Sequence, residues 1–276
     1  MFRLDMAASP AIQPPLDLPM PAGAQAAWEI IAGTIVAFTA FYFIRRARIE
    51  RSAFPLLFWL GTVPLMFAEP LFDIGMTCFY PHVGQHTAFE LYGRQMPVFL
   101  VLCYLGGIAP VMYTVSLRLA AGVDRAFVWK WFVFMALGTA VYEVITINLG
   151  LWTYYSPAHP IRLFNYPLGI GIENGAAFLL TALATAKLRP TMTGPRLWLA
   201  PLILPMVFVM GEFGTGWPYF SVINTASAID HRWLGFAGLA GTLLFALVLT
   251  GWVASQVTGR RDRVTASAGA ALPATP

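Results

Sequence analysis

Five acidic side chains interrupt otherwise apolar stretches of the sequence, and they are the residues whose type and spacing could support chemistry. They are Glu69, Asp73, Glu143, Glu173 and Glu212. A charged side chain near the middle of a membrane costs about 2.5–3.5 kcal/mol on insertion scales. Such groups almost always face the interior of a helix bundle or a wet cavity. These acids are therefore the candidate catalytic residues.

Four of the acids are expected at a similar depth if the apolar stretches are membrane-spanning helices. Glu69 and Glu143 lie 17 residues into outward-running helices, and Glu212 lies 16 residues into a third. These positions are roughly 25 Å from the cytoplasmic edge. Glu173 lies 7 residues into an inward-running helix, roughly 10 Å below the outer edge. We therefore predict one shared polar cavity in the outer half of the bilayer, with Asp73 one helical turn after Glu69.

Clustered carboxyl groups in an apolar pocket suit acid–base chemistry. Desolvation disfavours the ionised form of a carboxyl group, and a second carboxylate nearby disfavours it further. One group can then donate a proton at neutral pH while its partner accepts one. This arrangement suits cyclisation, dehydration or isomerisation of a lipophilic substrate. No cofactor is expected, because the sequence contains neither a glycine-rich dinucleotide motif after a strand nor a P-loop.

Polar and aromatic residues near the acids are candidate substrate-binding groups. Asn174 follows Glu173 directly, and Asn148 lies five residues after Glu143. We expect both amides and the Tyr142 hydroxyl to hold substrate oxygens. Arg94 is expected to pair with an acid, for example Asp73. The predicted substrate-binding residues are Tyr80, Arg94, Tyr142, Asn148, Trp152, Tyr154 and Asn174.

A metal site is an alternative interpretation of the same region. His82, His86 and Glu90 have the spacing i, i+4, i+8, which would align them on one face of a helix. Imidazole and carboxylate ligands suit iron or zinc. Gly84 lies between the two histidines and Pro81 precedes them, and both residue types disfavour a helix. We therefore expect no metal, with these three residues left as the alternative.

The composition indicates that these residues are carried by membrane-spanning helices. The 276 residues are 58% apolar and only 11% charged, against about 25% charged in soluble domains. A soluble domain of this length could not bury so much apolar surface, so a cytosolic enzyme, a disordered protein and a nucleic-acid binder are excluded. Seven segments are long enough to cross a bilayer, and they run over 27–44, 53–74, 97–119, 127–149, 166–186, 197–217 and 233–255.

The distribution of basic residues orients this bundle. Thirteen lysines and arginines fall on one side: Arg45, Arg46, Arg48, Arg51, Arg118, Arg125, Lys130, Lys187, Arg189, Arg196, Arg260, Arg261 and Arg263. Four fall on the other: Arg3, Arg94, Arg162 and Arg232. Because basic residues favour the cytoplasm, we predict an all-α bundle of seven transmembrane helices in the bacterial cell membrane, with the N-terminus outside and the C-terminus cytoplasmic. Residues 1–26 are expected to be a flexible segment, 27–256 the membrane domain and 257–276 a disordered tail.

Transport, sensing and a purely structural role remain as alternatives to catalysis. Acids inside membranes also form proton relays. A retinal Schiff base is not expected, because the two lysines, Lys130 and Lys187, lie at the cytoplasmic edges of their helices. We find none of the inverted repeats typical of transporters. The acids of a non-catalytic lipid-binding or scaffold protein would simply join helices by hydrogen bonds.

Three stretches of the sequence carry a resemblance to a known family. They read AEPLFDIGMTCFYPHVGQHTAFELYGRQMP (68–97), EVITINLGLWTYYSPAHP (143–160) and FNYPLGIGIENGAAF (164–178). Together with the seven apolar segments, they resemble the spirocyclase AveC family of actinobacterial membrane proteins, over roughly residues 28–255. The resemblance implies closure of a dihydroxy-ketone chain into a spiroketal. It supplies no catalytic residues, so the candidate site depends on the expected depth and chemistry of the acids.

Overall fold

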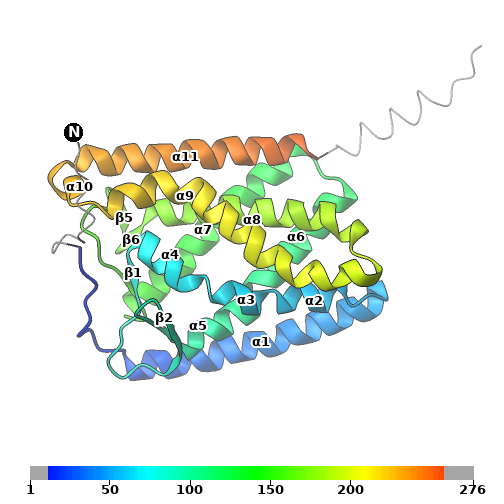
Figure 1. Cartoon of the computed structure of the whole chain (residues 1–276), viewed down its shortest axis with the longest axis horizontal. Coiled ribbons are helices and arrows are strands. Elements are labelled where there is room, and N and C mark those ends of the chain that lie inside the picture. The colour runs from blue at the N-terminus through cyan, green and yellow to red at the C-terminus, as the bar shows by residue number, and fades with distance from the viewer. Residues whose placement is uncertain (1–11, 258–276) are drawn as a thin grey trace, which may run out of the picture.

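The computed structural model describes residues 12–257, and this part of the chain is mostly helical. Within residues 12–257, five helices are long and apolar enough to cross a membrane. They are α1 (Ala22–Glu50), α7 (Arg125–Asn148), α8 (Leu168–Leu188, extended to Thr191 by the 3-10 turn η2, Arg189–Thr191), α11 (Arg232–Ser255), and the continuous run of α5 (Val98–Cys103), η1 (Tyr104–Ile108) and α6 (Ala109–Ala121). In Figure 1 the long helices lie side by side, with α1 and α11 along opposite edges of the bundle.

Two further apolar segments are broken rather than continuous helices. The first comprises α2 (Phe54–Leu60), α3 (Thr62–Met66) and α4 (Glu69–Met76), with a 51° bend before α4. The second comprises η3 (Gly194–Leu202), η4 (Leu204–Phe208) and α9 (Val209–Ile223), with a 44° bend. If each bent pair is one span, the number of candidate spans rises to seven. Pro70 in the first turn of α4 and Pro201 inside η3 explain the breaks, because proline removes a backbone donor and clashes with the preceding turn.

Helix α8 lies at the centre of the bundle and packs against α6, α7, α9 and α11. Glycines permit this close packing, because side chains larger than hydrogen would collide with neighbouring backbones. A Cβ atom at Gly171 would lie 2.7 Å from the Ala136 carbonyl oxygen, and one at Gly175 would lie 2.9 Å from that of Phe132. Helix α9 approaches from the other side, where a Cβ at Gly211 would lie 2.7 Å from Ala177 Cα.

The distortion in the α5–α6 span shows how a proline inside a membrane helix is accommodated. The π-helical turn η1 ends two residues before Pro110, which cannot donate to the carbonyl of Gly106. The buried Thr39 hydroxyl of α1 donates to that carbonyl instead, at 2.7 Å. The Trp59 indole donates to the adjacent Leu105 carbonyl, also at 2.7 Å. Side chains of neighbouring helices thus satisfy the carbonyls that the distortion exposes.

Short strands cover one end of the bundle, which we call the hairpin end. Strand β1 (Cys78–Phe79) pairs with β4 (Thr153–Tyr154), and this pairing joins the α4–α5 connection to the α7–α8 connection. Strands β2 (Thr87–Leu91) and β3 (Arg94–Pro97) form a hairpin, and β5 (Arg162–Leu163) pairs with β6 (Tyr166–Pro167). Tyr92 and Gly93 turn the hairpin with positive φ angles of 52° and 69°. The short helix α10 (Ser227–Asp230) precedes α11 at this end.

The N-terminal segment differs in part from the sequence-based prediction. Helix α1 begins at Ala22 rather than near residue 27. Before it, the Met20 amide donates to the Val83 carbonyl at 2.8 Å, and the Met20 side chain is buried. The segment before α1 therefore contacts the hairpin end at Met20. The predicted flexibility of residues 1–11 and disorder of residues 258–276, including Arg3, Arg260, Arg261 and Arg263, concern residues outside the described range.

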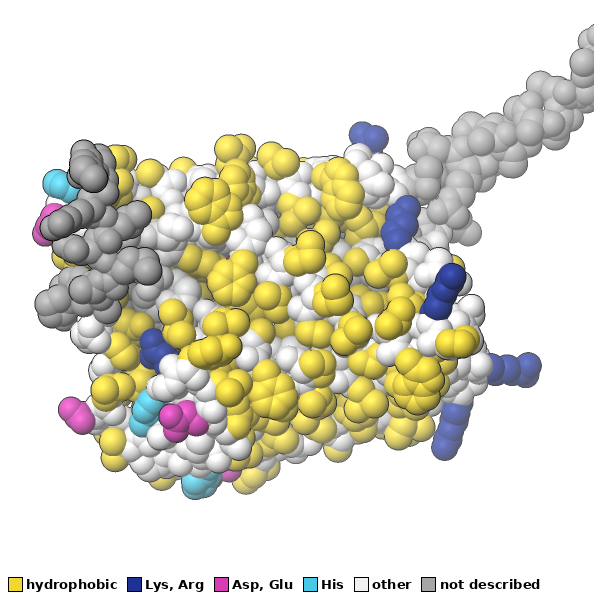
Figure 2. All heavy atoms as spheres, viewed as in Figure 1, with side chains coloured by type: hydrophobic (Ala, Val, Ile, Leu, Met, Phe, Trp, Pro, Cys, Tyr) yellow, Lys and Arg dark blue, Asp and Glu magenta, His cyan; other side chains and the backbone are white. Residues whose placement is uncertain are grey.

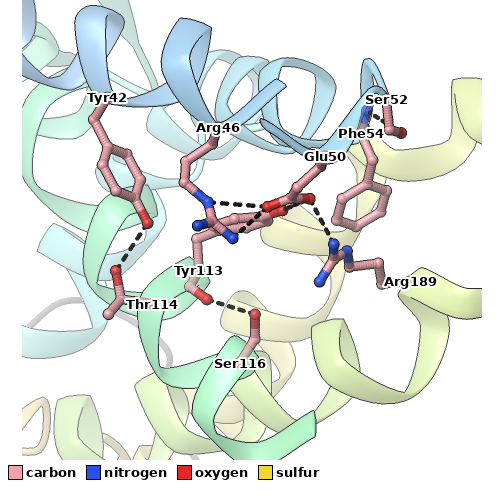
Figure 3. A network of polar contacts seen from close by, with 9 residues as sticks. All are labelled: Tyr42, Arg46, Glu50, Ser52, Phe54, Tyr113, Thr114, Ser116 and Arg189. Carbon is pink, nitrogen blue, oxygen red and sulfur yellow. Dashed lines mark hydrogen bonds and ion pairs between the residues drawn. The ribbon is translucent and has the colours of Figure 1, made fainter. Parts of the chain in front are cut away.

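The opposite end of the bundle, which we call the arginine-rich end, is fastened by a buried carboxylate. Most of the lysines and arginines visible in Figure 2 gather at this end, beyond a broad apolar surface. Figure 3 shows Glu50, at the end of α1, lying between Arg46 and Arg189, each with an N···O distance of 2.5 Å. The Tyr113 hydroxyl donates to the same carboxylate at 2.6 Å. Glu50 thereby ties α1 to α6 and to the end of α8.

Replacing Glu50 should destabilise the bundle. In Glu50→Gln, two arginines lose their charged partner, and we expect the free energy of unfolding to fall by about 1–3 kcal/mol. Thermal unfolding in detergent measures this as a lower Tm. The exposed Glu90 in β2 provides the matched control, Glu90→Gln, which should leave Tm unchanged. Equal Tm values for the two variants would contradict a stabilising role for this network.

Candidate functional site

A cavity of about 400 Å³ lies inside the bundle, and four of the five predicted acids line it. Glu69 and Asp73 belong to α4, Glu143 to α7 and Glu212 to α9. Most of the remaining wall is apolar or aromatic, with Met135, Phe178 and Phe208 among its residues. Asp73 lies close enough to Glu69 and Glu143 to interact with them electrostatically. Glu212 interacts with the same two carboxyl groups. The structure thus brings acids from three separate segments to one chamber.

Two tyrosines hold Glu69 in a defined orientation. The Tyr80 hydroxyl donates to Glu69 Oε1 at 2.8 Å. The Tyr104 hydroxyl donates to the other oxygen, Oε2. Burial and the nearby Glu69 carboxylate raise the pKa of Tyr80, so this phenol remains a donor at neutral pH. Both oxygens of Glu69 therefore have neutral donors, an arrangement that suits a carboxylate ion.

Glu143 is held in a similar way by residues of the hairpin end. The Trp152 indole donates to Glu143 Oε2 at 2.7 Å, and the Tyr154 hydroxyl donates to the same oxygen at 3.1 Å. Burial, followed by the charge of Glu143, raises the pKa of Tyr154 and keeps it protonated. The pairing of β1 with β4 brings these groups above the cavity, where the Tyr80 and Trp152 rings lie 5.6 Å apart.

Asp73 and Glu212 also line the cavity but lack such partners. Asp73 is 2% exposed and Glu212 is 1% exposed. Within residues 12–257, Asp73 Oδ2 and both carboxyl oxygens of Glu212 make no hydrogen bond. Burying a polar atom without a partner is costly. These oxygens are therefore the ones available to a molecule in the cavity.

Glu173 was predicted at the same site, but it lies behind the cavity wall. Its side chain is fully buried, and neither of its oxygens makes a hydrogen bond within the described part of the chain. It faces Gly216 of α9, where an added Cβ would lie 2.3 Å from Glu173 Oε2. Glu173 interacts electrostatically with Glu212 and Glu143, so it extends the acidic cluster without lining the chamber.

Five of the seven predicted substrate-binding residues line the cavity: Tyr80, Tyr142, Trp152, Tyr154 and Asn174. Asn148 does not, because its amide donates to the carbonyls of Val144 and Phe164 near the surface. Arg94 does not either. Its guanidinium donates to the Tyr155 hydroxyl at 2.9 Å and lies 5.6 Å from the centre of the Phe79 ring. The predicted ion pair between Arg94 and Asp73 is not among those formed by the described residues.

The alternative metal site is also wrong in its geometry. His82, His86 and Glu90 do not share a helix face, because this segment forms a turn followed by strand β2. The His86 ring is hydrogen-bonded to Glu29 of α1 at 2.9 Å. The His82 ring lies 4.6 Å from that of Phe79, and burial lowers its pKa. Across residues 12–257, no three His, Cys, Asp or Glu side chains are arranged to hold a metal ion.

Tyr104 and two cysteines also line the cavity, although the sequence alone does not indicate that they would. Tyr104 lies in the π-helical turn η1, and its hydroxyl reaches Glu69 across the chamber. A tyrosine in the middle of an apolar stretch is expected to pack in the core, so the partner of Tyr104 becomes evident only from the fold. Cys78 lies beside Asp73, and Cys103 accepts a hydrogen bond from Tyr142 at 3.3 Å. Both thiols are free rather than joined in a disulfide.

Comparisons with known proteins add no assignment to this geometry. No protein-family model matches the chain, and neither a curated protein nor a solved structure matches it.

Substitution of Gly216 should disturb the acidic cluster, whereas a nearby glycine should tolerate the same change. The Cβ of Gly216→Ala would collide with Glu173 and with the Phe220 ring, at 2.5 Å from its Cζ. We expect a loss of about 1–3 kcal/mol in the free energy of unfolding. Gly214 on the same helix has open space around its Cβ position, so Gly214→Ala is the control and should not destabilise. Denaturation of both variants in detergent tests this, and equal stability would contradict the packing described.

Protonation of His159 should weaken the hairpin end in acid. Its ring is hydrogen-bonded to Thr77 at 3.0 Å and to Tyr219 at 2.7 Å, and burial, with a contribution from Arg162, lowers its pKa to about 3. The unfolded chain binds the proton near pH 6.5, so this contribution to stability is complete above that pH and is lost as the pH falls toward 3. Between pH 7 and pH 5 the loss is roughly 2 kcal/mol. Tm should therefore fall more steeply over this range in the unaltered protein than in His159→Gln, and parallel slopes would refute the assignment.

Proposed function

We propose that the protein is a membrane-embedded, cofactor-free acid–base cyclase that acts on a lipophilic substrate. The observation that carries this proposal is that four carboxyl groups in one apolar chamber fall into two kinds, those with hydrogen-bond donors and those with free oxygens. Two of them, Glu69 and Glu143, are held by neutral donors, and two, Asp73 and Glu212, present free oxygens. Such a division separates a proton acceptor from a proton donor, which is the requirement of general acid–base catalysis.

The proposed reaction is a spiroketal-type cyclisation or a related dehydration of a polyketide- or terpenoid-like chain. In spiroketal formation, a dihydroxy-ketone loses one water as two hydroxyl oxygens bond to the former carbonyl carbon. Glu212, in its neutral form, would protonate the departing oxygen. The Glu69 or Glu143 carboxylate would stabilise the cationic intermediate and accept the proton of the attacking hydroxyl. Asn174, Tyr142 and Asp73 line the same wall and would orient the oxygens of the chain.

The chamber also suits this chemistry because its wall is mostly apolar, which would disfavour water inside it. Hydration reverses ketal formation, so a dry site favours the cyclised product. The aromatic rings of Tyr80 and Trp152 cover the acids at the hairpin end. An apolar cavity further restricts a flexible chain to conformations in which its reacting groups meet.

For the topology, we propose seven spans in a cell membrane, with each bent pair counted as one. The arginine-rich end would face the cytoplasm, since basic residues favour that side. The N-terminus and the hairpin end would then be outside, the C-terminus would be cytoplasmic, and the acids would lie nearer the outer face.

A second candidate function is proton relay or transport, and Glu173 favours it. This carboxyl lies beyond the chamber wall and interacts with Glu212, so together they extend the acids along the bundle. A relay would need Glu173 to exchange protons, whereas a cyclase would not need its ionisation. Glu173→Gln therefore separates the two functions, because cyclisation should persist in this variant if it folds.

Removal of the free acid should abolish turnover without unfolding the protein. Glu212→Gln keeps the side-chain volume, and we expect product formation to fall by about 100-fold or more. The assay incubates membranes with a synthetic long-chain dihydroxy-ketone and follows loss of one water by mass spectrometry. Glu90→Gln is the control and should retain activity. A folded Glu212→Gln variant with unchanged turnover, or no conversion by the unaltered protein, would count against the proposal.

A further inference from the structure

The acidic chamber is open on one side of the bundle. Four residues of its wall are also exposed on the outer surface of the helices: Ile35 of α1, Gly107 of η1, and Gly138 and Tyr142 of α7. Ile35 is 45% exposed and Tyr142 is 36% exposed. A residue that lines a cavity and also reaches the surface lies at the rim of an opening. These four residues therefore outline a lateral opening between α1, the α5–α6 span and α7.

Two glycines keep this opening wide. A Cβ atom added at Gly107 or at Gly138 would meet no neighbouring heavy atom within 4 Å. This contrasts with Gly106, whose added Cβ would lie 3.0 Å from Ile35 Cγ2, because Gly106 faces α1. Toward the hairpin end the opening is bounded by aromatic contacts, since the Trp28 and Tyr142 rings lie 5.9 Å apart and Tyr142 is hydrogen-bonded to Cys103.

The opening lies near the middle of the apolar belt. Ile35 is 13 residues into the 29-residue helix α1, and Gly138 is 13 residues into the 24-residue helix α7. Each position is roughly 20 Å along its helix. Acyl chains, rather than headgroups or water, surround a bundle at this level. A molecule that passes through the opening must therefore arrive from the hydrocarbon phase.

The charges of the wall restrict the kind of molecule that can bind. Four carboxyl groups line the chamber, and within the described part of the chain its wall contains no Lys, Arg or His. An anionic headgroup would meet like charges without a compensating cation. A cationic headgroup would have to cross acyl chains with its charge unpaired, which is unfavourable. An uncharged molecule with hydroxyl or carbonyl oxygens meets neither obstacle, and it can hydrogen-bond to the free oxygens of Glu212 and Asp73.

We propose that the opening is a portal through which an uncharged long-chain amphiphile reaches the chamber from the bilayer, with its oxygenated end at the acids and its apolar tail in the portal. That this amphiphile is the substrate rests on the proposed cyclase function. That it binds in the chamber does not rest on this function, because the opening and the charges of the wall are independent of turnover.

Photolabelling of the full chain in lipid nanodiscs tests the portal. Three hexadecyl probes carry the same mid-chain diazirine and end in an alcohol, a quaternary ammonium or a sulfonate. We expect the alcohol to label cavity residues such as Met135 and Tyr104 at least 10-fold more than either charged probe. Equal labelling of these residues by the sulfonate, or no labelling by the alcohol, would overturn the proposal.

Variants of the rim provide the second measurement. The double substitution Gly107→Leu and Gly138→Leu places side chains in the open space of the portal, and it should reduce labelling of Tyr104 by the alcohol about 10-fold or more. Gly33→Leu is the matched control, because Gly33 in α1 also has open space around its Cβ position but does not line the chamber. Control labelling should equal that of the unaltered protein. Labelling of the double variant at the control level would show that molecules enter elsewhere.

The two proposals fail in distinguishable ways. Glu212→Gln should still admit the alcohol probe, because it keeps a hydrogen-bonding side chain at the same position. Labelling without turnover in the unaltered protein would support the portal and refute the cyclase. Turnover without alcohol labelling of the chamber would refute the portal alone.

Discussion

A carboxyl group in an apolar bundle needs hydrogen-bond partners or an open space, and this requirement organises the protein. Glu69 and Glu143 obtain partners from Tyr80, Tyr104, Trp152 and Tyr154. Three of these donors come from the strands and turns at the hairpin end rather than from the spans. The short strands therefore do more than connect helices, because they carry the groups that orient the acids. Asp73 and Glu212 line the same chamber, and oxygens of both groups lack a hydrogen-bond partner within the described residues.

The convergence of the acids could be predicted from the sequence because depth in a membrane follows from counting residues along a helix. Glu69, Glu143 and Glu212 are expected at one level on this basis, and all three line the chamber. The direction in which each side chain points around its helix axis depends on packing, so a residue count does not predict it. Glu173 lies at a compatible depth but faces α9 instead of the chamber, since Gly216 leaves room for it there. Asn148 likewise points away from the chamber, because its amide donates to backbone carbonyls near the surface.

Other differences arise where tertiary contacts override local pattern. The spacing of His82, His86 and Glu90 suits a helix, yet pairing with β3 holds residues 87–91 extended. Arg94 was expected beside an acid, but aromatic rings and the Tyr155 hydroxyl surround its guanidinium. Breaks at Pro70 and Pro201 could be anticipated from proline chemistry. The partner that Tyr104 finds in Glu69 could not, because the two residues are 35 positions apart and meet only across the chamber.

Helix α1 has a consequence for how the chain assembles. Its fully buried residues are only Gln25, Ala32, Thr39 and Phe43, and many of its other side chains are exposed on the outside of the bundle. Its main partners, α5 and η1, are encoded some fifty residues later, so they leave the ribosome after it. During that interval α1 can pack only against the segment that follows it directly, such as α2, and the mostly apolar side chains between Ile30 and Ile44 suit it to a lipid environment. Docking then occurs late, when the Thr39 hydroxyl meets the carbonyl of Gly106.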